Sequence, residues 1–199
     1  IPVLPVSAKI GLRLRASMRN RISSVPVRLR VDAGYKWQML WNTVGVLRGS
    51  DPRDHIVLGA HRDAWVYGAV DPSSGTVAML EAVRGLGELL KQGWKPRRTI
   101  VIGSWDAEEE GLVGSTEWVE QHMPELSHAV AYFNTDIAVS GPSFNASAVP
   151  SLKEFLRDVA RAVPSPEGGS VYDHWKGEQR ERHAGGQGSG SGRGARHRR

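Results

Sequence analysis

The residues of this sequence that could do chemistry lie in its middle part. His61, Asp71, Glu108, Glu109 and Asp136 are of the types that bind metal ions or transfer protons. The chain has no cysteine, so thiolate ligands and disulfide bonds are excluded, and His, Asp and Glu would have to hold any metal ion. Each residue alone also has a plain structural interpretation, because a single histidine more often serves as a hydrogen-bonded structural residue. Their positions in the fold therefore decide what they do.

Hydrophobic periodicity predicts alternating strands and helices from about Thr43 onward. Short apolar runs bounded by turn residues predict strands at 43–48, 55–60, 99–104 and 129–134. Apolar residues that recur every three to four positions predict helices at 74–90, 112–122 and 152–163. Ser73 or Ser74 is the expected cap of the first helix, and Met123 and Pro124 are expected to end the second. The runs 99–104 and 129–134 are apolar throughout, which is typical of strands buried on both faces.

This alternation predicts an α/β fold with three layers, in which a mostly parallel sheet carries helices on both faces. In such open sheets, sites form beyond the carboxyl ends of the strands. His61, the pair Glu108 and Glu109, and Asp136 each follow a predicted strand, and Asp71 precedes a predicted helix. We therefore expect these side chains to share one edge of the sheet. So many carboxylates together are unfavourable unless a cation compensates them.

Zinc suits these residue types, because it accepts imidazole nitrogen and carboxylate oxygen. A carboxylate that bridges two ions is the usual way to hold them roughly 3.5 Å apart, and Asp71 is the best candidate for the bridge. Asp63 lies two residues after His61 and could fix the tautomer of an imidazole ligand. The adjacent Glu108 and Glu109 could divide the work, one binding metal and the other acting as general base.

The net charge of +5 is unevenly distributed along the chain. Residues 1–30 carry +7 and residues 176–199 carry +5, whereas residues 31–175 carry −7. Arginine-rich ends could supply phosphate contacts to nucleic acid. The ends lack interleaved aromatic residues for base stacking, however, and the middle is acidic, so no nucleic-acid partner is expected.

Composition divides the chain into three parts. Residues 1–41 form an irregular basic segment, residues 42–175 form the folded part, and residues 176–199 are a Gly/Ser/Arg-rich tail predicted to be disordered. No apolar run reaches the roughly 18 to 20 residues that cross a bilayer. The sequence starts at Ile1 without an initiator Met, and we interpret the chain as a fragment or a processed product.

Four motifs in this order resemble a known family, the M28 zinc peptidases. They are Gly59-Ala-His-Arg-Asp63, Gly68-Ala-Val-Asp-Pro-Ser-Ser-Gly75, Ser104-Trp-Asp-Ala-Glu-Glu109 and Tyr132-Phe-Asn-Thr-Asp136. The branch that the sequence most resembles contains glutamate carboxypeptidase II and the transferrin-receptor-like proteins. The resemblance runs from about Asn42 to Trp175.

The resemblance implies an incomplete phosphorylase/hydrolase-like zinc exopeptidase domain with two zinc ions. Asp71 would bridge the ions, His61 and Asp136 would complete one of them, Glu109 would bind the other, and Glu108 would be the general base. Glutamates that match Glu117 and Glu120 help to bind a structural calcium in this branch. The family's remaining zinc ligand is a histidine in a Tyr-His motif far downstream, and His174 lies too early to match it.

The expected function is therefore that of a metal-dependent exopeptidase of glutamate carboxypeptidase or aminopeptidase type, with a peptide substrate and low activity in this fragment. The alternative is a non-catalytic binding protein of the transferrin-receptor-like kind. Full-length members of the branch are expected to be homodimers and extracellular or membrane-anchored ectodomains. The sequon Asn145-Ala-Ser147 would fit such a location.

Overall fold

The computed structural model describes residues 5–19, 26–32, 34, 36–139, 141 and 143–177. The chain divides into two compact units, with the boundary after Met39. The predicted tail falls almost entirely at 178–199, outside the described residues. The structure differs from the prediction where that tail was to start, because residues 171–177 are helical.

The first unit contains helix α1, Ala8–Arg19, where the sequence predicted irregular structure. Ala, Leu, Arg and Met are strong helix formers, and the hydroxyl of Ser7 accepts a hydrogen bond from the backbone N–H of Ile10 at 3.4 Å. No residue of α1 is buried. The helix was missed because its apolar residues alternate with arginines and show no face that a core would require.

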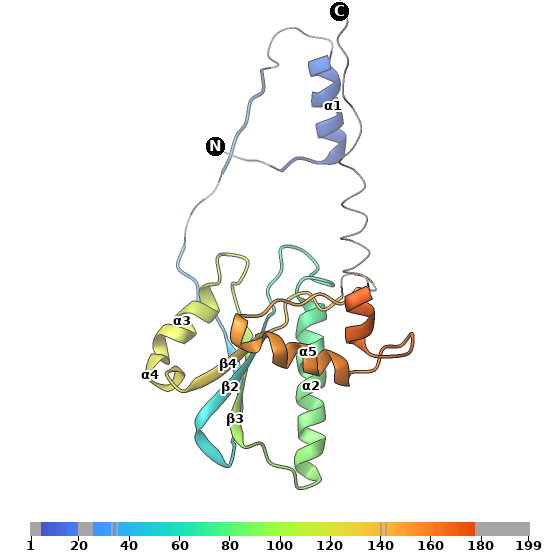
Figure 1. The fold of residues 1–199 in the computed structure, drawn as a ribbon. Coiled ribbons are helices and arrows are strands. Elements are labelled where there is room, and N and C mark those ends of the chain that lie inside the picture. Colours follow the sequence, from blue (N-terminus) through green and yellow to red (C-terminus); the bar gives the residue numbers. More distant parts are fainter. Residues whose placement is uncertain are drawn as a thin grey trace, which may run out of the picture. The chain divides into compact units, whose positions relative to one another are not determined.

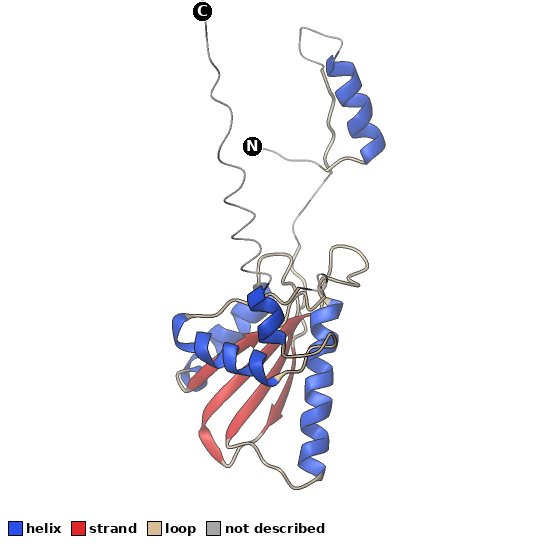
Figure 2. Cartoon of the chain, turned by 45° about the vertical axis from the view of Figure 1, so that its right-hand side comes forward, coloured by secondary structure: helices blue, strands red, loops and turns tan. Residues whose placement is uncertain are grey.

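The second unit is built on a four-stranded sheet in the order β1-β3-β2-β4 (Figures 1 and 2). Its strands are β1 (Thr43–Leu47), β2 (Asp51–His61), β3 (Arg98–Trp105) and β4 (Ala129–Asn134). The pairs β2–β3 and β2–β4 are parallel, and β1 runs antiparallel to β3 at one edge. The prediction of a mostly parallel α/β sheet is confirmed.

The helices that join and follow the strands are α2 (Ser73–Lys91), α3 (Val113–Gln121), α4 (Met123–Leu126) and α5 (Lys153–Ala162), with a 3-10 turn at Pro150–Leu152. In Figure 1, α3 and α4 lie to one side of the sheet and α2 to the other. Among the described residues, no helix has the length and apolar character that a membrane span requires.

Aromatic contacts show that helices cover both faces of the sheet. Phe133 of β4 pairs with Leu58 of β2 and packs against a phenylalanine of α5, with ring centroids 5.9 Å apart. Trp105 of β3 pairs with His61 of β2 and packs against Trp118 of α3 at 5.1 Å. Leu58 and His61 lie three positions apart on one strand and so point to opposite faces. The predicted three-layer arrangement is therefore present.

The core lies between these layers and is small. Its buried residues are Val57, Ala60, Met79, Trp105, Ala107 and Ala160, with Pro72 fully enclosed. Strand β3 is an inner strand whose residues are all buried or half-buried, as its apolar sequence predicted. Strand β4 is mostly exposed, so the prediction that it is buried on both faces is wrong. The reason is its place at the edge of the sheet, where β2 is its one neighbour in the part of the chain that the structure describes.

Of two local predictions about helix ends, the first is wrong. Neither Ser73 nor Ser74 caps α2, because the N-cap position is Pro72 and no side chain caps the helix. The hydroxyl of Ser74 instead accepts a hydrogen bond from the backbone N–H of Ala138 at 3.0 Å. The prediction that the second helix ends at Met123 and Pro124 is confirmed, because α3 ends at Gln121. These two residues then start the short helix α4, in which proline occupies the first turn, where it needs no N–H partner.

Candidate metal centre

His61 ends strand β2 and supplies the centre of the site. Its side chain is only 3% exposed. The ring nitrogen Nδ1 lies 3.1 Å from the backbone carbonyl oxygen of Asp63, and the hydroxyl of Thr76 donates to the carbonyl of His61 at 2.6 Å. Because a carbonyl only accepts, Nδ1 must carry the proton, and this leaves Nε2 to face the remaining neighbours.

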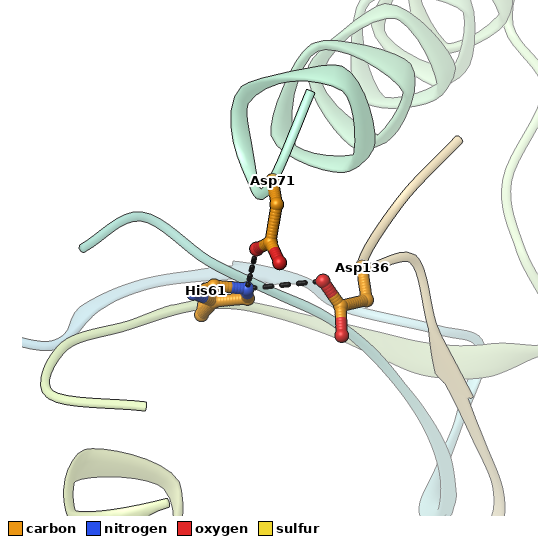
Figure 3. Close-up of side chains that lie close together, drawn as sticks. All are labelled: His61, Asp71 and Asp136. Atoms are coloured by element: carbon orange, nitrogen blue, oxygen red, sulfur yellow. Dashed lines mark hydrogen bonds and ion pairs between the residues drawn. The ribbon is translucent and has the colours of Figure 1, made fainter. Parts of the chain in front are cut away.

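Two carboxylates meet at that second nitrogen, as Figure 3 shows. The Nε2 atom of His61 lies 3.1 Å from Oδ1 of Asp71 and 3.0 Å from Oδ1 of Asp136. One ligand atom from each of the three residues lies within 4.8 Å of the other two. Both aspartates are 47% exposed, so the cluster has a buried imidazole on one side and open access on the other.

Close backbone packing brings these segments together. A side chain at Gly75, in the first turn of α2, would meet the carbonyl oxygens of Thr135 and Asp136 at 2.0 Å. The hydroxyl of Thr135 donates to the carbonyl of Gly75 at 3.1 Å, and its N–H donates to the carbonyl of Gly59 at 3.0 Å. Only glycine allows the start of α2 to lie this close to the residues that follow β4. The approach sets Asp136 beside the loop that holds Asp71.

The electrostatics of His61 require a positive charge. Burial lowers the pKa of the imidazole. The hydrogen bond to Asp136 and the negative charges of Asp136, Glu108 and Asp63 raise this pKa by more than burial lowers it, so the net shift is upward. The hydrogen-bonding neighbours of both ring nitrogens are acceptors. Either an imidazolium or a neutral imidazole bound to a cation satisfies them.

The turn after β3 brings Glu108 to the edge of this cluster. Its Oε2 lies 3.9 Å from Nδ1 of His61. The carboxylate of Asp63 accepts the backbone N–H of Glu108 at 3.0 Å and that of Glu109 at 3.1 Å. Burial of Asp63 raises its pKa, but these N–H donors lower it more, so the net shift is downward and Asp63 stays ionised. Asp63 thus acts on His61 mainly through its carbonyl, since its carboxylate is 3.6 Å from the ring.

Glu108 has the electrostatic character of a proton acceptor. Burial raises its pKa, and the charges of Asp136, Glu109 and Asp63 add to the rise, while His61 lowers it in part. A carboxylate with a raised pKa takes up a proton more readily near neutral pH. The residue also lines a cavity of about 650 Å³ together with His61, Asp136 and apolar side chains of α3 and β4.

Not every predicted residue joins the cluster. The backbone N–H of Glu109 is held by Asp63, but its carboxylate is not among the ligand atoms grouped around His61. Glu117 and Glu120 are exposed on α3 and belong to no such group among the described residues. His174 bonds the carbonyl of Gly168 at 2.7 Å and takes no part in the cluster.

The donor set fits a metal ion. One imidazole nitrogen and two carboxylate oxygens supply three ligands with an open side, which is the arrangement of catalytic zinc sites. The proton on Nδ1, held by the carbonyl of Asp63, leaves the Nε2 lone pair free to bind the ion. Sequence reasoning missed Thr76, whose hydroxyl binds the carbonyl of His61, and the pair of Arg62 and Asp106 at the base of the turn that carries Glu108.

The fold and the site together define a class of protein. It is an α/β protein with a cluster of potential metal ligands beyond the carboxyl ends of its parallel strands. The chain belongs to peptidase family M28, whose family model matches residues 42–182. It is 51% identical over 140 residues to a protein of Arabidopsis thaliana named probable glutamate carboxypeptidase LAMP1. The alignment covers 68% of this chain and 21% of that protein. It is 44% identical over 171 residues to aminopeptidase NAALADL1 of Mus musculus, covering 83% of this chain and 21% of that protein.

Solved structures agree with the family. A peptidase M28 precursor from Shewanella amazonensis has a TM-score of 0.51 and 26% identity, with 65% of this chain and 29% of that chain covered. LapA of Legionella pneumophila has a TM-score of 0.51 and 25% identity, with 69% of this chain and 43% of that chain covered. The chain thus spans well under half the length of these relatives.

Proposed function

We propose that this chain carries the first part of the catalytic site of a metal-dependent exopeptidase. The observation that supports it best is the meeting of His61, Asp71 and Asp136 around one buried imidazole nitrogen. Membership of family M28 supports the same conclusion. The non-catalytic alternative has no support from the relatives, which are named as carboxypeptidases and aminopeptidases.

The proposed ion is zinc, and each residue has a role toward it. His61, Asp71 and Asp136 would hold one ion, and Glu109 would hold a second together with the carboxylate of Asp71. Bound zinc ions lower the pKa of water and polarise a scissile carbonyl. Glu108 takes the proton of the attacking water, which its raised pKa favours, and then delivers it to the leaving amine. Asp63 holds Glu108 in reach through the backbone N–H.

Among the described residues, the second ion has too few ligands. Glu109 and the shared Asp71 are two carboxylates without an imidazole, a weak set for zinc. We therefore propose that the chain binds one zinc ion more tightly than a second and has low peptidase activity by itself. Glu117 and Glu120 remain the proposed calcium ligands.

The names of the relatives suggest the substrate, a peptide cut at one end, with glutamate carboxypeptidase and aminopeptidase as the two candidate types. A homodimeric, extracellular or membrane-anchored full-length protein is proposed as well. Asn145 is exposed and lies in a loop, which fits that location.

Zinc titration of the purified, metal-free chain tests the proposal. We expect one tight equivalent, and His61→Ala or Asp136→Asn should weaken it by about 100-fold or more, since even outer residues of such sites contribute 10–100-fold. Glu110→Gln is the matched control, because Glu110 is exposed beside the site glutamates and lies outside the cluster. A folded chain that retains no zinc, or that binds it equally well without His61, would overturn the proposal.

A further inference from the structure

The turn at residues 106–114 holds both site glutamates, and it is anchored at its base by a charged pair that lies outside the metal cluster. We infer that Arg62 and Asp106 are positioning residues, which fix this turn so that Glu108 and Glu109 face the site. The inference rests on the proposed function only for the roles of the two glutamates. The anchoring itself is a property of the metal-free chain.

Asp106 is the centre of the anchor. Its Oδ2 accepts the backbone N–H of Trp41 at 2.9 Å and lies 3.2 Å from a guanidinium nitrogen of Arg62. Its Oδ1 accepts the N–H of Ala107 at 3.1 Å. The side chain is 23% exposed, so these bonds are partly protected from water. Hydrogen bonds to a charged group are stronger than neutral ones, and this carboxylate accepts two in addition to its ion pair with Arg62.

Arg62 connects the turn to the sheet. Its second guanidinium nitrogen donates to the hydroxyl of Thr43 at 3.2 Å and to the carbonyl of Ser104 at 3.4 Å. Its backbone N–H donates to the carbonyl of Trp105 at 3.0 Å. One arginine at the end of β2 therefore contacts β1, the end of β3 and the first residue of the turn. Lysine could not reproduce this, because it lacks the planar, forked donor set.

Asn42 closes the anchor from the other side. Its amide oxygen accepts the N–H of Asp106 at 3.0 Å, and its amide nitrogen donates to the carbonyl of Gly114 at 2.7 Å. Gly114 in turn donates its N–H to the carbonyl of Asp106 at 3.1 Å. A side chain at Gly114 would meet that carbonyl oxygen at 2.2 Å. The two ends of the turn are thus held together around one asparagine.

The backbone between the anchor and the glutamates is strained. Ala107 adopts a left-handed conformation with φ of 52° and is only 8% exposed. Such a conformation is unfavourable in a residue other than glycine and persists only where the surroundings enforce it. The strain redirects the chain after Asp106, so that the N–H groups of Glu108 and Glu109 point to Asp63. An anchor is needed to maintain it.

Two successive residues thus hold opposite parts of one turn. Arg62 holds its base through Asp106, and Asp63 holds its glutamates through their backbone N–H groups. Side chains of neighbouring residues point in different directions, which allows the segment after His61 to do both. The segment therefore supplies one proposed metal ligand, His61, and the two residues, Arg62 and Asp63, that hold the turn with the proposed general base.

Hydrogen–deuterium exchange of individual backbone amides in the metal-free chain tests the inference. In Arg62→Met and in Asp106→Ala, the amides of Glu108 and Glu109 should exchange at least about tenfold faster, because the turn opens locally more often. Amides at the centre of β2 and β3, such as Val57 and Val101, should change less than twofold. Arg62→Lys should recover only part of the protection, since it restores the charge without the fork.

A matched control lies near the amino ends of the inner strands β2 and β3, opposite the ends that carry the site. Arg98 pairs with Asp54 at 3.5 Å and has similar exposure, 39% against 31% for Arg62. Arg98→Met should leave the exchange of Glu108 and Glu109 unchanged. Zinc binding to His61, Asp71 and Asp136 should weaken no more than about threefold in the Asp106 variant, because none of these ligands lies in the turn.

Two results would overturn the inference. Unchanged exchange at Glu108 and Glu109 in both variants would show that the turn keeps its position without the pair. Equally faster exchange in the turn and in the strands would show that the pair supports the whole fold rather than the turn. Failure of the chain to bind zinc would count against the proposed function and leave the exchange result intact.

Discussion

The hydroxyl of Thr76 in α2 donates to the backbone carbonyl of His61 at 2.6 Å and so joins the first turn of the helix to the end of β2. Thr76→Val keeps the shape but leaves that partly buried carbonyl without its donor. Such a loss costs about 1–3 kcal/mol. We expect a lower urea midpoint for unfolding and weaker zinc binding, with Thr116→Val on α3 as the matched control. Equal effects of the two variants would contradict this role of Thr76.

Two glycines of the same helix should respond in opposite directions to alanine. At Gly75 the added methyl group would meet two backbone oxygens at 2.0 Å, whereas at Gly87 nothing lies within 4 Å. Gly75→Ala should destabilise the chain by more than about 3 kcal/mol, through overpacking and displacement of Asp136. Gly87→Ala should stabilise it by about 0.5–1 kcal/mol, because alanine favours helix. Thermal unfolding measures both, and a well-folded Gly75→Ala protein would disprove the close approach.

The pH dependence of α5 follows from Glu154. Hydrogen bonds from Arg157 and then Arg161 lower the pKa of this carboxyl. Because the folded pKa is the lower one, the stabilisation is present above the unfolded value of about 4.3 and is lost as pH falls through the folded value. Carbon NMR of the Glu154 carboxyl should show this low midpoint. Arg157→Gln should move it toward the ordinary value, whereas Arg84→Gln on α2 should not.

Among the described residues only β2 pairs with β4, and the other edge of β4 should make the chain self-associate. Val130 and Tyr132 are about half exposed, and the strand Ala129–Asn134 has no charged residue or proline to block pairing. Val130→Lys should raise the concentration at which larger species appear in sedimentation velocity. Val77→Lys places the same charge on α2, where the valine is 61% exposed, and should have little effect. Equal gains from both would assign the effect to net charge.

Sequence reasoning placed the strands and helices well, because the apolar periodicity of β2, α2 and β3 reflects burial that these segments keep in the fold. It could not place burial itself. The residues of β4 are as apolar as those of β3, and only the order of the strands makes one an edge and the other central. The cap of α2 was also out of reach, since Ser74 is used by a hydrogen bond to a residue 64 positions away.

The same limit applies to the site. His61, Asp71 and Asp136 could be chosen because their positions at strand and helix ends imply one shared edge. The pairing of Arg62 with Asp106 could not be predicted from the sequence. The two residues follow different strands, and neither belongs to the hydrophobic periodicity that identifies the elements. The helical α1 was missed for a related reason, since its propensity is high but it covers no core.

The large sequence separation between His61 and Asp136 determines when the metal cluster can form during folding. His61 and Asp136 are 75 positions apart, and they meet only when β4 has paired with β2 across the whole intervening helix-strand-helix segment. Contacts of such long range form slowly, because the loop must close before they contribute. A metal ion that needs both His61 and Asp136 as ligands can therefore bind only after the sheet is nearly complete. It would therefore leave the refolding rate almost unchanged and lengthen the lifetime of the native state.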